Sequence, residues 1–329
     1  MAKDKRPIIG RKKATRRGPT TAEFFEGWLL SIAHSVKPST LRRYEAYVRL
    51  HAIPAFGDVR LRKLSPGDLE RLYAAKLGDG LAPRSVLHLH MALHRALRHA
   101  QRRGLVDTNV TELVEPPKPQ RREMQSLSPE QARRLLSVVR GDRLEALYVL
   151  AITTGMRQGE LLGLRWRDID FEGRSLRVTG SIQYLPGRGL RVSSPKTRGS
   201  RRQVMLSQIA IDALHRRREA QKQERARVGE KWQDGDFVFT SRNGRPLYAT
   251  NVVSRSFQKL LAAAGVPRIR FHDLRHTAAS LLLGQGVHPK IVSEMLGHAS
   301  IGITLDLYSH ATPTIQRGAT AAFDRLLGN

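Results

Sequence analysis

One tyrosine toward the end of the sequence stands among residue types that suit phosphate chemistry. Tyr308 lies in the run LDLYSH, ten residues after His298 in the run LGH. A tyrosine hydroxyl can act as a nucleophile, but its pKa of about 10 makes it a weak one unless its surroundings favour the phenolate. A lone tyrosine at such a position more often packs in a core or an interface. Tyr308 therefore indicates covalent chemistry only in combination with other groups.

A second group of ionisable residues lies in the run FHDLRHTAASLLL. His272, Arg275 and His276 are spaced i, i+3 and i+4, which places them on one face of a helical turn. The apolar residues that follow predict a helix anchored in a core. The next predicted helix ends at Gly297, so His298 is expected to project just beyond its C-terminus.

Two further cations come earlier in the chain. In the run ITTGMRQGELLGLRW, Gly155 ends an apolar helix and Arg157 begins the next one. Glu160 follows at i+3 on the same face, where its carboxylate can hold the guanidinium in position. Lys196, in SSPKTRGSRRQV, is expected in a short turn between two strands. Each residue alone would be an ordinary surface charge, and only the combination indicates a site.

The elements that must position these residues belong to the second part of the chain, over residues 127–329. A helix is predicted from Ser128, followed by the strand-like runs SLRVTGSI, LRVSS and RQVMLS with Gly-rich turns between them. Helical patterns return around residue 208 and continue to the end. This pattern predicts a mostly α fold with a small antiparallel β-sheet. The tail carries an apolar stripe at helical spacing, formed by Ile315, Ala319, Ala322, Phe323 and Leu326.

The first part of the chain is predicted to be a small, basic, all-helical domain over residues 20–112. Its last helix is expected over residues 83–103, with an apolar stripe on one face. The stretch 113–126 contains three prolines, which cannot continue a helix, and is expected to form an extended linker.

The charge of the chain predicts a polyanionic partner. It has 57 Lys+Arg against 29 Asp+Glu, a formal net charge of +28. Nucleic acid suits this excess best, because neutralising its phosphates releases condensed counterions. Residues 1–19 form a basic arm without periodicity, expected to be disordered and either to lie along DNA or to act as a solubilising tail. The sequence has no long apolar run that would predict a membrane-spanning helix.

No metal site or cofactor is predicted. Cysteine is absent, which excludes disulfides and thiolate ligands and fits a reducing cytoplasm. With DNA as its partner, the protein is expected to be cytoplasmic and nucleoid-associated. His90 and His94 are spaced i, i+4, but no carboxylate nearby in the sequence completes a ligand set, so a polar or DNA-facing stripe is expected. No G-x-S-x-G run accompanies the serines near His272, which argues against a hydrolase triad.

Taken together, these segments resemble the tyrosine recombinase (phage integrase) family. TGMRQGELLGLRW, HDLRH, LGH and LDLYSH are similar to the boxes of that family, and the similarity extends over about residues 20 to 320. The resemblance implies an α+β DNA breaking-rejoining fold, with a SAM-like core-binding domain and a catalytic domain forming a clamp around double-stranded DNA. Many phage integrases begin with a folded arm-binding domain, whereas only the short basic arm precedes Thr20 here.

The resemblance also implies a role for each candidate residue. Arg157 and Arg275 would clamp the non-bridging phosphate oxygens, for which planar guanidinium donors are suited. His272 and His298 would hydrogen-bond the scissile phosphate, Lys196 would protonate the leaving 5′ oxygen, and Tyr308 would become joined to the 3′ phosphate. The linkage keeps the bond energy, so neither ATP nor a metal is expected.

Several alternatives remain open at this level. The resemblance implies a homo-tetramer on DNA, in which the tail helix docks onto a neighbouring protomer, but such a helix can also pack on its own domain. An accessory DNA-bending or directionality factor is a further expected partner. A dimer resolvase and a topoisomerase IB-like enzyme share the same chemistry. A DNA-binding regulator that has lost activity fits the intact set of six candidates least well.

Overall fold

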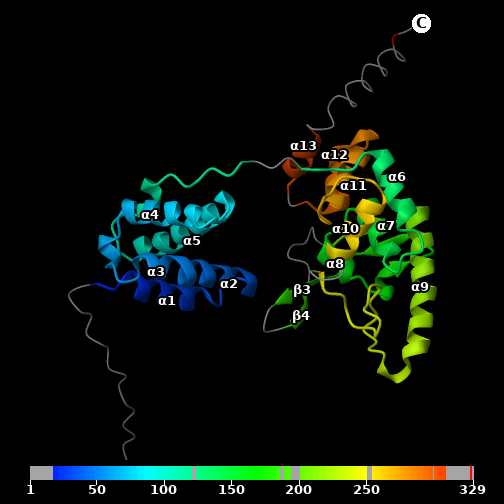
Figure 1. Ribbon diagram of the computed structural model, residues 1–329, viewed down its shortest axis with the longest axis horizontal. Coiled ribbons are helices and arrows are strands. Elements are labelled where there is room, and N and C mark those ends of the chain that lie inside the picture. The colour runs from blue at the N-terminus through cyan, green and yellow to red at the C-terminus, as the bar shows by residue number, and fades with distance from the viewer. Residues whose placement is uncertain are drawn as a thin grey trace, which may run out of the picture. The chain divides into compact units, whose positions relative to one another are not determined.

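The computed structural model describes residues 18–120, 124–185, 189–193, 201–249, 254–298, 300–308 and Leu327. The chain divides into two compact units, residues 1–122 and 123–329 (Figure 1). The expected basic arm, apart from Gly18 and Pro19, lies outside the described residues, and so do Lys196 and the apolar stripe of the tail. None of the described helices is long and apolar enough to cross a bilayer.

The first unit is built from helices at the positions that the apolar spacing predicts. Its elements are α1 (Thr21–Ile32), α2 (Pro38–Tyr47), the π-helical turn η1 (Val48–Ala52), α3 (Ile53–Phe56), η2 (Leu61–Lys63), α4 (Pro66–Gly78), α5 (Pro83–Arg102) and η3 (Val110–Leu113). A capping box between Thr20 and Glu23 begins α1. Helix α2 continues into the wider η1 just before Pro54, which has no N–H for the usual hydrogen bond. Phe25, Trp28 and Leu89 lie in the core.

The two histidines of α5 make polar contacts with neighbouring elements of the first unit. His90 Nδ1 lies 2.9 Å from the hydroxyl of Tyr73 on α4. His94 Nδ1 lies 2.9 Å from Thr111 Oγ1 and 3.1 Å from Asn109 Nδ2. Both rings are half-buried. The polar contacts agree with the predicted polar stripe, and the two rings fasten α5 to α4 and η3.

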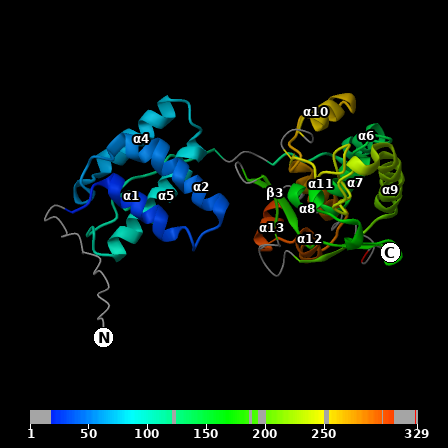
Figure 2. The same cartoon turned by 90° about the horizontal axis from the view of Figure 1, so that it is seen from below.

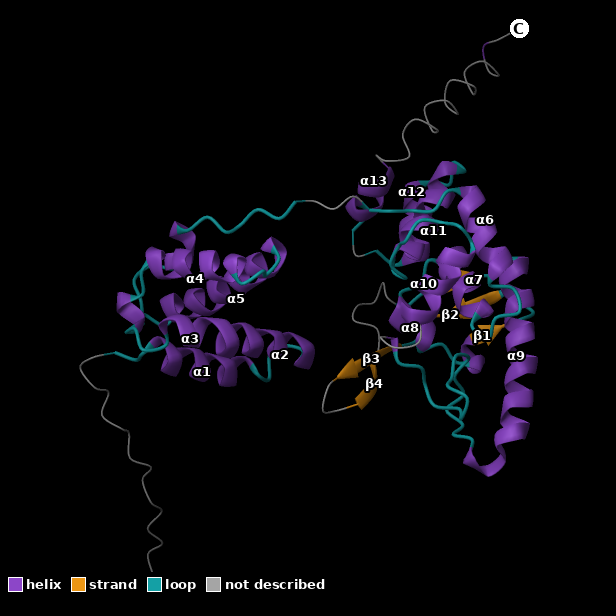
Figure 3. Ribbon diagram, viewed as in Figure 1, coloured by secondary structure: helices purple, strands orange, loops and turns teal. Residues whose placement is uncertain are grey.

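The second unit contains all of the described strands (Figure 3). Its helices are α6 (Pro129–Val138), α7 (Glu145–Thr154), α8 (Gln158–Leu162), η4 (Trp166–Asp168), α9 (Gln208–Val228), η6 (Gly229–Lys231), α10 (Ser254–Ala263), α11 (Asp273–Gly284), α12 (Pro289–Leu296) and α13 (Gly302–Tyr308). Its strands are β1 (Ile169–Asp170), β2 (Ser175–Arg177), β3 (Ser181–Leu185), β4 (Gly189–Ser193) and β5 (Gln203–Met205). Helix α7 is buried along nearly its whole length and packs against α9 and α11.

The strands form two small antiparallel sheets. One has the order β1-β2-β5, with Leu176 of β2 opposite both Ile169 and Val204. The other is the hairpin β3-β4. The predicted fold class, mostly α with a small antiparallel sheet, is confirmed. The run SLRVTGSI, however, supplies two strands that belong to different sheets, because the chain leaves the first sheet between β2 and β3.

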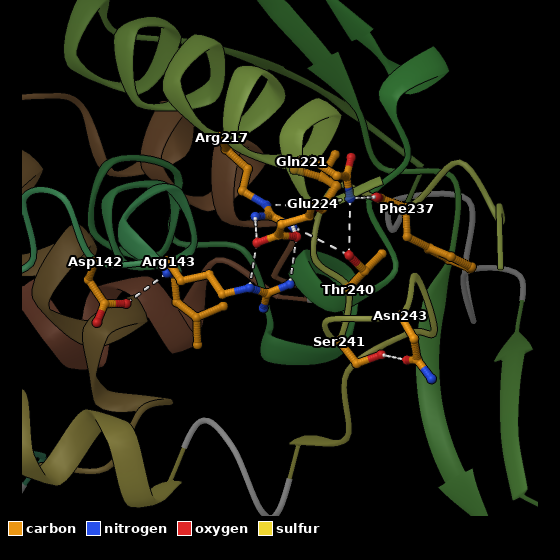
Figure 4. A network of polar contacts seen from close by, with 11 residues as sticks. Asp142, Arg143, Arg217, Gln221, Glu224, Phe237, Thr240, Ser241 and Asn243 are labelled. Carbon is orange, nitrogen blue, oxygen red and sulfur yellow. Dashed lines mark hydrogen bonds and ion pairs between the residues drawn. The ribbon is translucent and has the colours of Figure 1, made fainter. Parts of the chain in front are cut away.

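A buried ion-pair network fastens α9 to the body of this unit (Figure 4). The Arg217 side chain is 2% exposed and donates to both carboxylate oxygens of Glu224, at 3.1 and 3.2 Å. Arg143 donates to the same carboxylate from the loop before α7, at 2.7 and 2.9 Å. Arg217 also donates to the carbonyl oxygen of Val238 and to Thr240. One carboxylate on α9 thus pairs with two guanidinium groups and joins this helix to the loop before α7.

Candidate active site

The described candidate residues come from elements that meet around the C-terminal end of α12. Arg157 is the N-cap of α8, His272 is the N-cap of α11, Arg275 lies in the first turn of α11, and His298 directly follows the C-cap of α12. Helices α11, α12 and α13 lie side by side in both views (Figures 1 and 2). Residues more than a hundred positions apart are thereby gathered at one helix end.

Three arginines donate to three successive carbonyl groups at that helix end. The acceptors are the carbonyl oxygens of Met295, Leu296 and Gly297. Arg202 donates to the first at 2.7 Å, Arg275 to the second at 2.8 Å and Arg157 to the third at 2.9 Å. The last carbonyls of a helix have no partner within it, and their partial negative charge favours cations. The end of α12 therefore holds three guanidinium groups together.

Glu160 joins two of these arginines. Its Oε1 accepts from Arg157 Nη1 at 2.8 Å, and its Oε2 accepts from Arg202 Nη2 and from the backbone N–H of Arg157, both at 3.0 Å. Burial alone raises the pKa of this carboxyl, but the positive charge and hydrogen bond of Arg202, with the hydrogen bonds of Arg157, lower it below its ordinary value. The carboxylate is thus ionised and holds Arg157 in position, as the i, i+3 spacing predicted.

Arg275 is the most deeply buried of the candidate residues that the structure describes. It is 4% exposed, and its Nη1 donates to the carbonyl oxygens of Gly155 and Leu296, both at 2.8 Å. Its Nη2 is buried without a hydrogen-bond partner among the described residues. Burial, helped by the nearby charge of Arg157, lowers the pKa of Arg275 to about 9. The side chain is still cationic at neutral pH and has one donor to spare.

His298 is held by the following helix. Its Nδ1 lies 2.8 Å from Oγ1 of Thr304, a fully buried residue of α13. Burial and the positive charges of Arg275 and Arg157 lower the pKa of His298 to about 4. The imidazole is therefore neutral at physiological pH, and it connects the end of α12 to the helix that ends at Tyr308.

His272 lies edge-on to His276, with the ring centroids 5.4 Å apart. Burial, followed by the neighbouring His276 and Arg275, lowers the pKa of His272. Asp273 does not pair with this imidazole, because its carboxylate accepts hydrogen bonds from Arg270. A hydrolase-type His–Asp arrangement is thus absent here, and His272 is a neutral group beside Arg275.

The structure brings together part of the predicted set. Arg157, Arg275 and His298 share the end of α12, and His272 lies one helical turn from Arg275. Tyr308 is described in its backbone only, as the last residue of α13. Sequence reasoning missed Thr304 and Arg202. Nothing in the sequence marks the threonine, and Arg202 is one of several arginines in a basic run.

Family models cover both units. The model of the phage integrase family matches residues 125–314, more than half of the chain, and that of the phage integrase N-terminal SAM-like domain matches residues 20–77. The chain belongs to the phage integrase family. It is therefore a tyrosine recombinase, a site-specific enzyme that breaks and rejoins DNA.

Individual family members and solved structures agree with this assignment. The chain is 31% identical to the tyrosine recombinase XerC-like protein of Caldanaerobacter subterraneus subsp. tengcongensis, over 93% of this chain and 83% of that protein. Its fold is similar to that of the Tn1549 transposon integrase in complex with a circular intermediate DNA, with a TM-score of 0.80, 22% identity, and coverage of 94% of this chain and 100% of that one. A lambda integrase tetramer bound to a Holliday junction gives a TM-score of 0.64 at 19% identity, over 91% of this chain and 80% of that one. The two structural likenesses show the fold.

Both the backbone conformation and the packing of the site require a glycine at position 155. Its φ of +61° is in the left-handed region, and a Cβ there would lie 2.1 Å from Cδ2 of Leu296. We expect Gly155→Ala to lower the free energy of unfolding by roughly 2–5 kcal/mol, since it combines a left-handed alanine with overpacking. Gly141→Ala is the control, because Gly141 has a φ of +80° but no atom within 4 Å of a Cβ. Equal losses for both variants in urea unfolding would contradict the packing argument.

Proposed function

We propose that this chain is a site-specific DNA integrase that cuts and rejoins DNA through a covalent 3′-phosphotyrosyl intermediate on Tyr308. The observation that carries the proposal is the gathering of Arg157, Arg275 and His298 at the end of α12. Helix α13, which ends at Tyr308, is tied to the same place by the bond between Thr304 and His298.

The arginines supply what a pentavalent phosphate needs. Negative charge grows on the non-bridging oxygens during attack, and donors already in place stabilise it without reorganisation. Arg275 suits this role because its Nη1 is held by two carbonyls while its buried Nη2 has no partner among the described residues. Arg157 is fixed by Glu160 and by the end of α12, and its side chain is still 40% exposed, so it can reach a bound phosphate.

The histidines and the lysine complete the proposed mechanism. When the Thr304 hydroxyl donates to Nδ1 of His298, the neutral ring carries its proton on Nε2 and can donate it to a phosphate oxygen. His272, also neutral, accepts the proton of the Tyr308 hydroxyl as the oxygen attacks phosphorus. The leaving 5′ oxygen takes a proton from Lys196. Rejoining reverses these steps, with the free 5′ hydroxyl displacing Tyr308.

The reaction so described needs no ATP, because the phosphotyrosyl bond replaces the phosphodiester bond that it breaks. The proposal also makes it independent of metal ions, since guanidinium groups neutralise the phosphate. Within the described part of the chain, no group of three His, Asp or Glu side chains is placed to hold a metal.

We further propose how the chain engages DNA. The helical domain over residues 20–112 and the catalytic domain over residues 127–329, joined by the linker 113–126, would clamp double-stranded DNA at the nucleoid. Four copies would act together, as in the lambda integrase tetramer bound to a Holliday junction. A dimer resolvase would use the same site on a different target. An accessory DNA-bending or directionality factor is a proposed further partner.

A direct test is to trap the covalent intermediate without metal. We expect the protein, incubated in EDTA with supercoiled plasmid carrying the DNA around its own gene, to become linked to nucleotide. After denaturation, nuclease and trypsin digestion, the adduct should lie on the peptide of residues 291–317, in which Tyr308 is the sole tyrosine. An adduct that forms only with added magnesium would refute metal independence. Tight binding to a mapped site without any adduct would favour a regulator that has lost activity.

A further inference from the structure

Arg202 connects the small sheet to the catalytic arginines. It immediately precedes β5, and its carbonyl oxygen accepts the backbone N–H of Val178 beside β2, so its backbone belongs to the sheet. Its side chain leaves the sheet and is only 7% exposed. Nε donates to the carbonyl oxygen of Met295 and Nη2 to Glu160, as described above. Arg202 also follows, by six positions, the lysine proposed as the general acid.

The side chain of Arg202 lies close to Gly297, in the turn that carries His298. A Cβ added to Gly297 would lie 3.0 Å from Nη1 and 3.2 Å from both Cδ and Cζ of Arg202. The turn therefore packs against this side chain, and both the tight approach and the left-handed φ of +68° favour glycine at position 297. The carbonyl oxygen of Gly297 also accepts a hydrogen bond from Arg157. A change in the position of Arg202 would therefore move both Arg157 and His298.

We propose that Arg202 is a positioning residue for strand cleavage: it orients Glu160, and through it Arg157, while it supports the Gly297 turn that presents His298. The inference rests on the proposed function, since it assigns a residue that acts through those groups. Arg202 itself is too deeply buried to touch DNA.

Fold stability alone does not account for an arginine at this position. The Nη1 atom of Arg202 is buried without a hydrogen-bond partner among the described residues, and a buried unsatisfied donor destabilises a fold. Replacing buried ion pairs by apolar side chains is often neutral or stabilising. The presence of a buried arginine with one unsatisfied nitrogen is better explained by its hydrogen bond to Glu160 and its packing against the Gly297 turn.

The first test compares cleavage with DNA binding. We expect Arg202→Met to lower the single-turnover cleavage rate of a nicked suicide substrate by about 10²-fold, the scale of one lost preorganised donor, with the Kd for the same DNA nearly unchanged. Arg202→Lys should recover part of the rate because it keeps the charge beside Glu160. Arg217→Met is the matched control, since Arg217 is as deeply buried and ion-paired but contacts Glu224 on α9. It should lower Tm and leave the rate of bound protein unchanged.

A pH series separates positioning from general damage. In Arg202→Met the strongest influence that lowers the pKa of Glu160 is gone while its burial remains, so this pKa rises. Protonated Glu160 loses its negative charge and holds Arg157 more weakly, so the rate relative to wild type should fall as the pH is lowered. The added substitution Glu160→Gln should abolish that pH dependence. A deficit that is constant with pH and is matched by Arg217→Met would overturn the inference.

A second measurement does not depend on cutting. Carbon-13 NMR of glutamate-labelled protein should show the Glu160 carboxyl titrating at higher pH in Arg202→Met than in wild type or in Arg217→Met. An unchanged Glu160 titration refutes the role of Arg202, whatever the cleavage assay gives. If Arg202→Met shifts the Glu160 titration but the wild-type protein forms no phosphotyrosyl adduct, the proposed function is refuted. The effect of Arg202 on Glu160 then still stands.

Discussion

Tyr308→Phe is expected to abolish strand cleavage and to leave DNA binding intact. The substitution removes one hydroxyl oxygen, which is the proposed nucleophile, so the covalent bond to the phosphate cannot form at this residue. Removing the nucleophile of a covalent enzyme typically lowers its rate by 10⁴-fold or more, on the order of 10⁶ in the extreme. The measurement is the covalent complex on a denaturing gel, with the Kd obtained from a mobility shift on the same DNA.

The matched control for that experiment is Tyr184→Phe, which removes the hydroxyl of a tyrosine on β3 that is 49% exposed in the same unit. It should cut at nearly the wild-type rate. Residual covalent complex with Tyr308→Phe would show that another residue attacks the phosphate. If Tyr308→Phe were indistinguishable from wild type in every assay, the proposed intermediate would be wrong.

Arg275→Lys is expected to show the second largest effect, a cleavage rate about 10²–10³-fold lower. Lysine keeps the positive charge, but a single ammonium cannot donate to Gly155, to Leu296 and to a phosphate oxygen in the fixed geometry of a guanidinium. Carbonyls that lose their donor in the buried site also lower the free energy of unfolding, by about 1–3 kcal/mol for each unsatisfied group.

The two effects of Arg275→Lys can be measured apart. Urea unfolding gives the loss of stability, and single-turnover cleavage at saturating protein gives the loss of rate. Arg217→Lys serves as control, because it alters a buried ion-paired arginine of the same unit whose partners lie around α9. A loss of rate below tenfold, or an equal loss with Arg217→Lys, would mean that Arg275 stabilises the fold without contributing to phosphate stabilisation.

The parts of the site that could be predicted from the sequence are those set by local geometry. The spacing of His272 and Arg275 follows from the helical repeat, and the pairing of Arg157 with Glu160 follows from the same repeat at a helix start. Gly155 ends α7, as predicted, and the structure adds that it does so in the left-handed conformation. These relations need no knowledge of tertiary contacts, and the structure agrees with each of them.

The parts that could not be predicted depend on contacts across the fold. Arg202 reaches Glu160 over 42 positions and Met295 over 93. Among 57 Lys and Arg residues, nothing local marks it as buried. The inward orientation of His94 likewise depends on Asn109 and Thr111 beyond the end of α5. The helical repeat of about 3.6 residues per turn places a residue on one face of a helix. Tertiary packing alone decides which other element that face contacts.

The shared end of α12 has a consequence for how this enzyme can change over generations. Because one helix terminus holds three arginines, substitutions among them should be strongly epistatic: the first removes most of the function, and later ones add little. Gradual decay of activity is then improbable as an evolutionary route. A lineage would lose recombination with a single substitution, and once further arginines had also been replaced, regaining it would require the reversion of all of them.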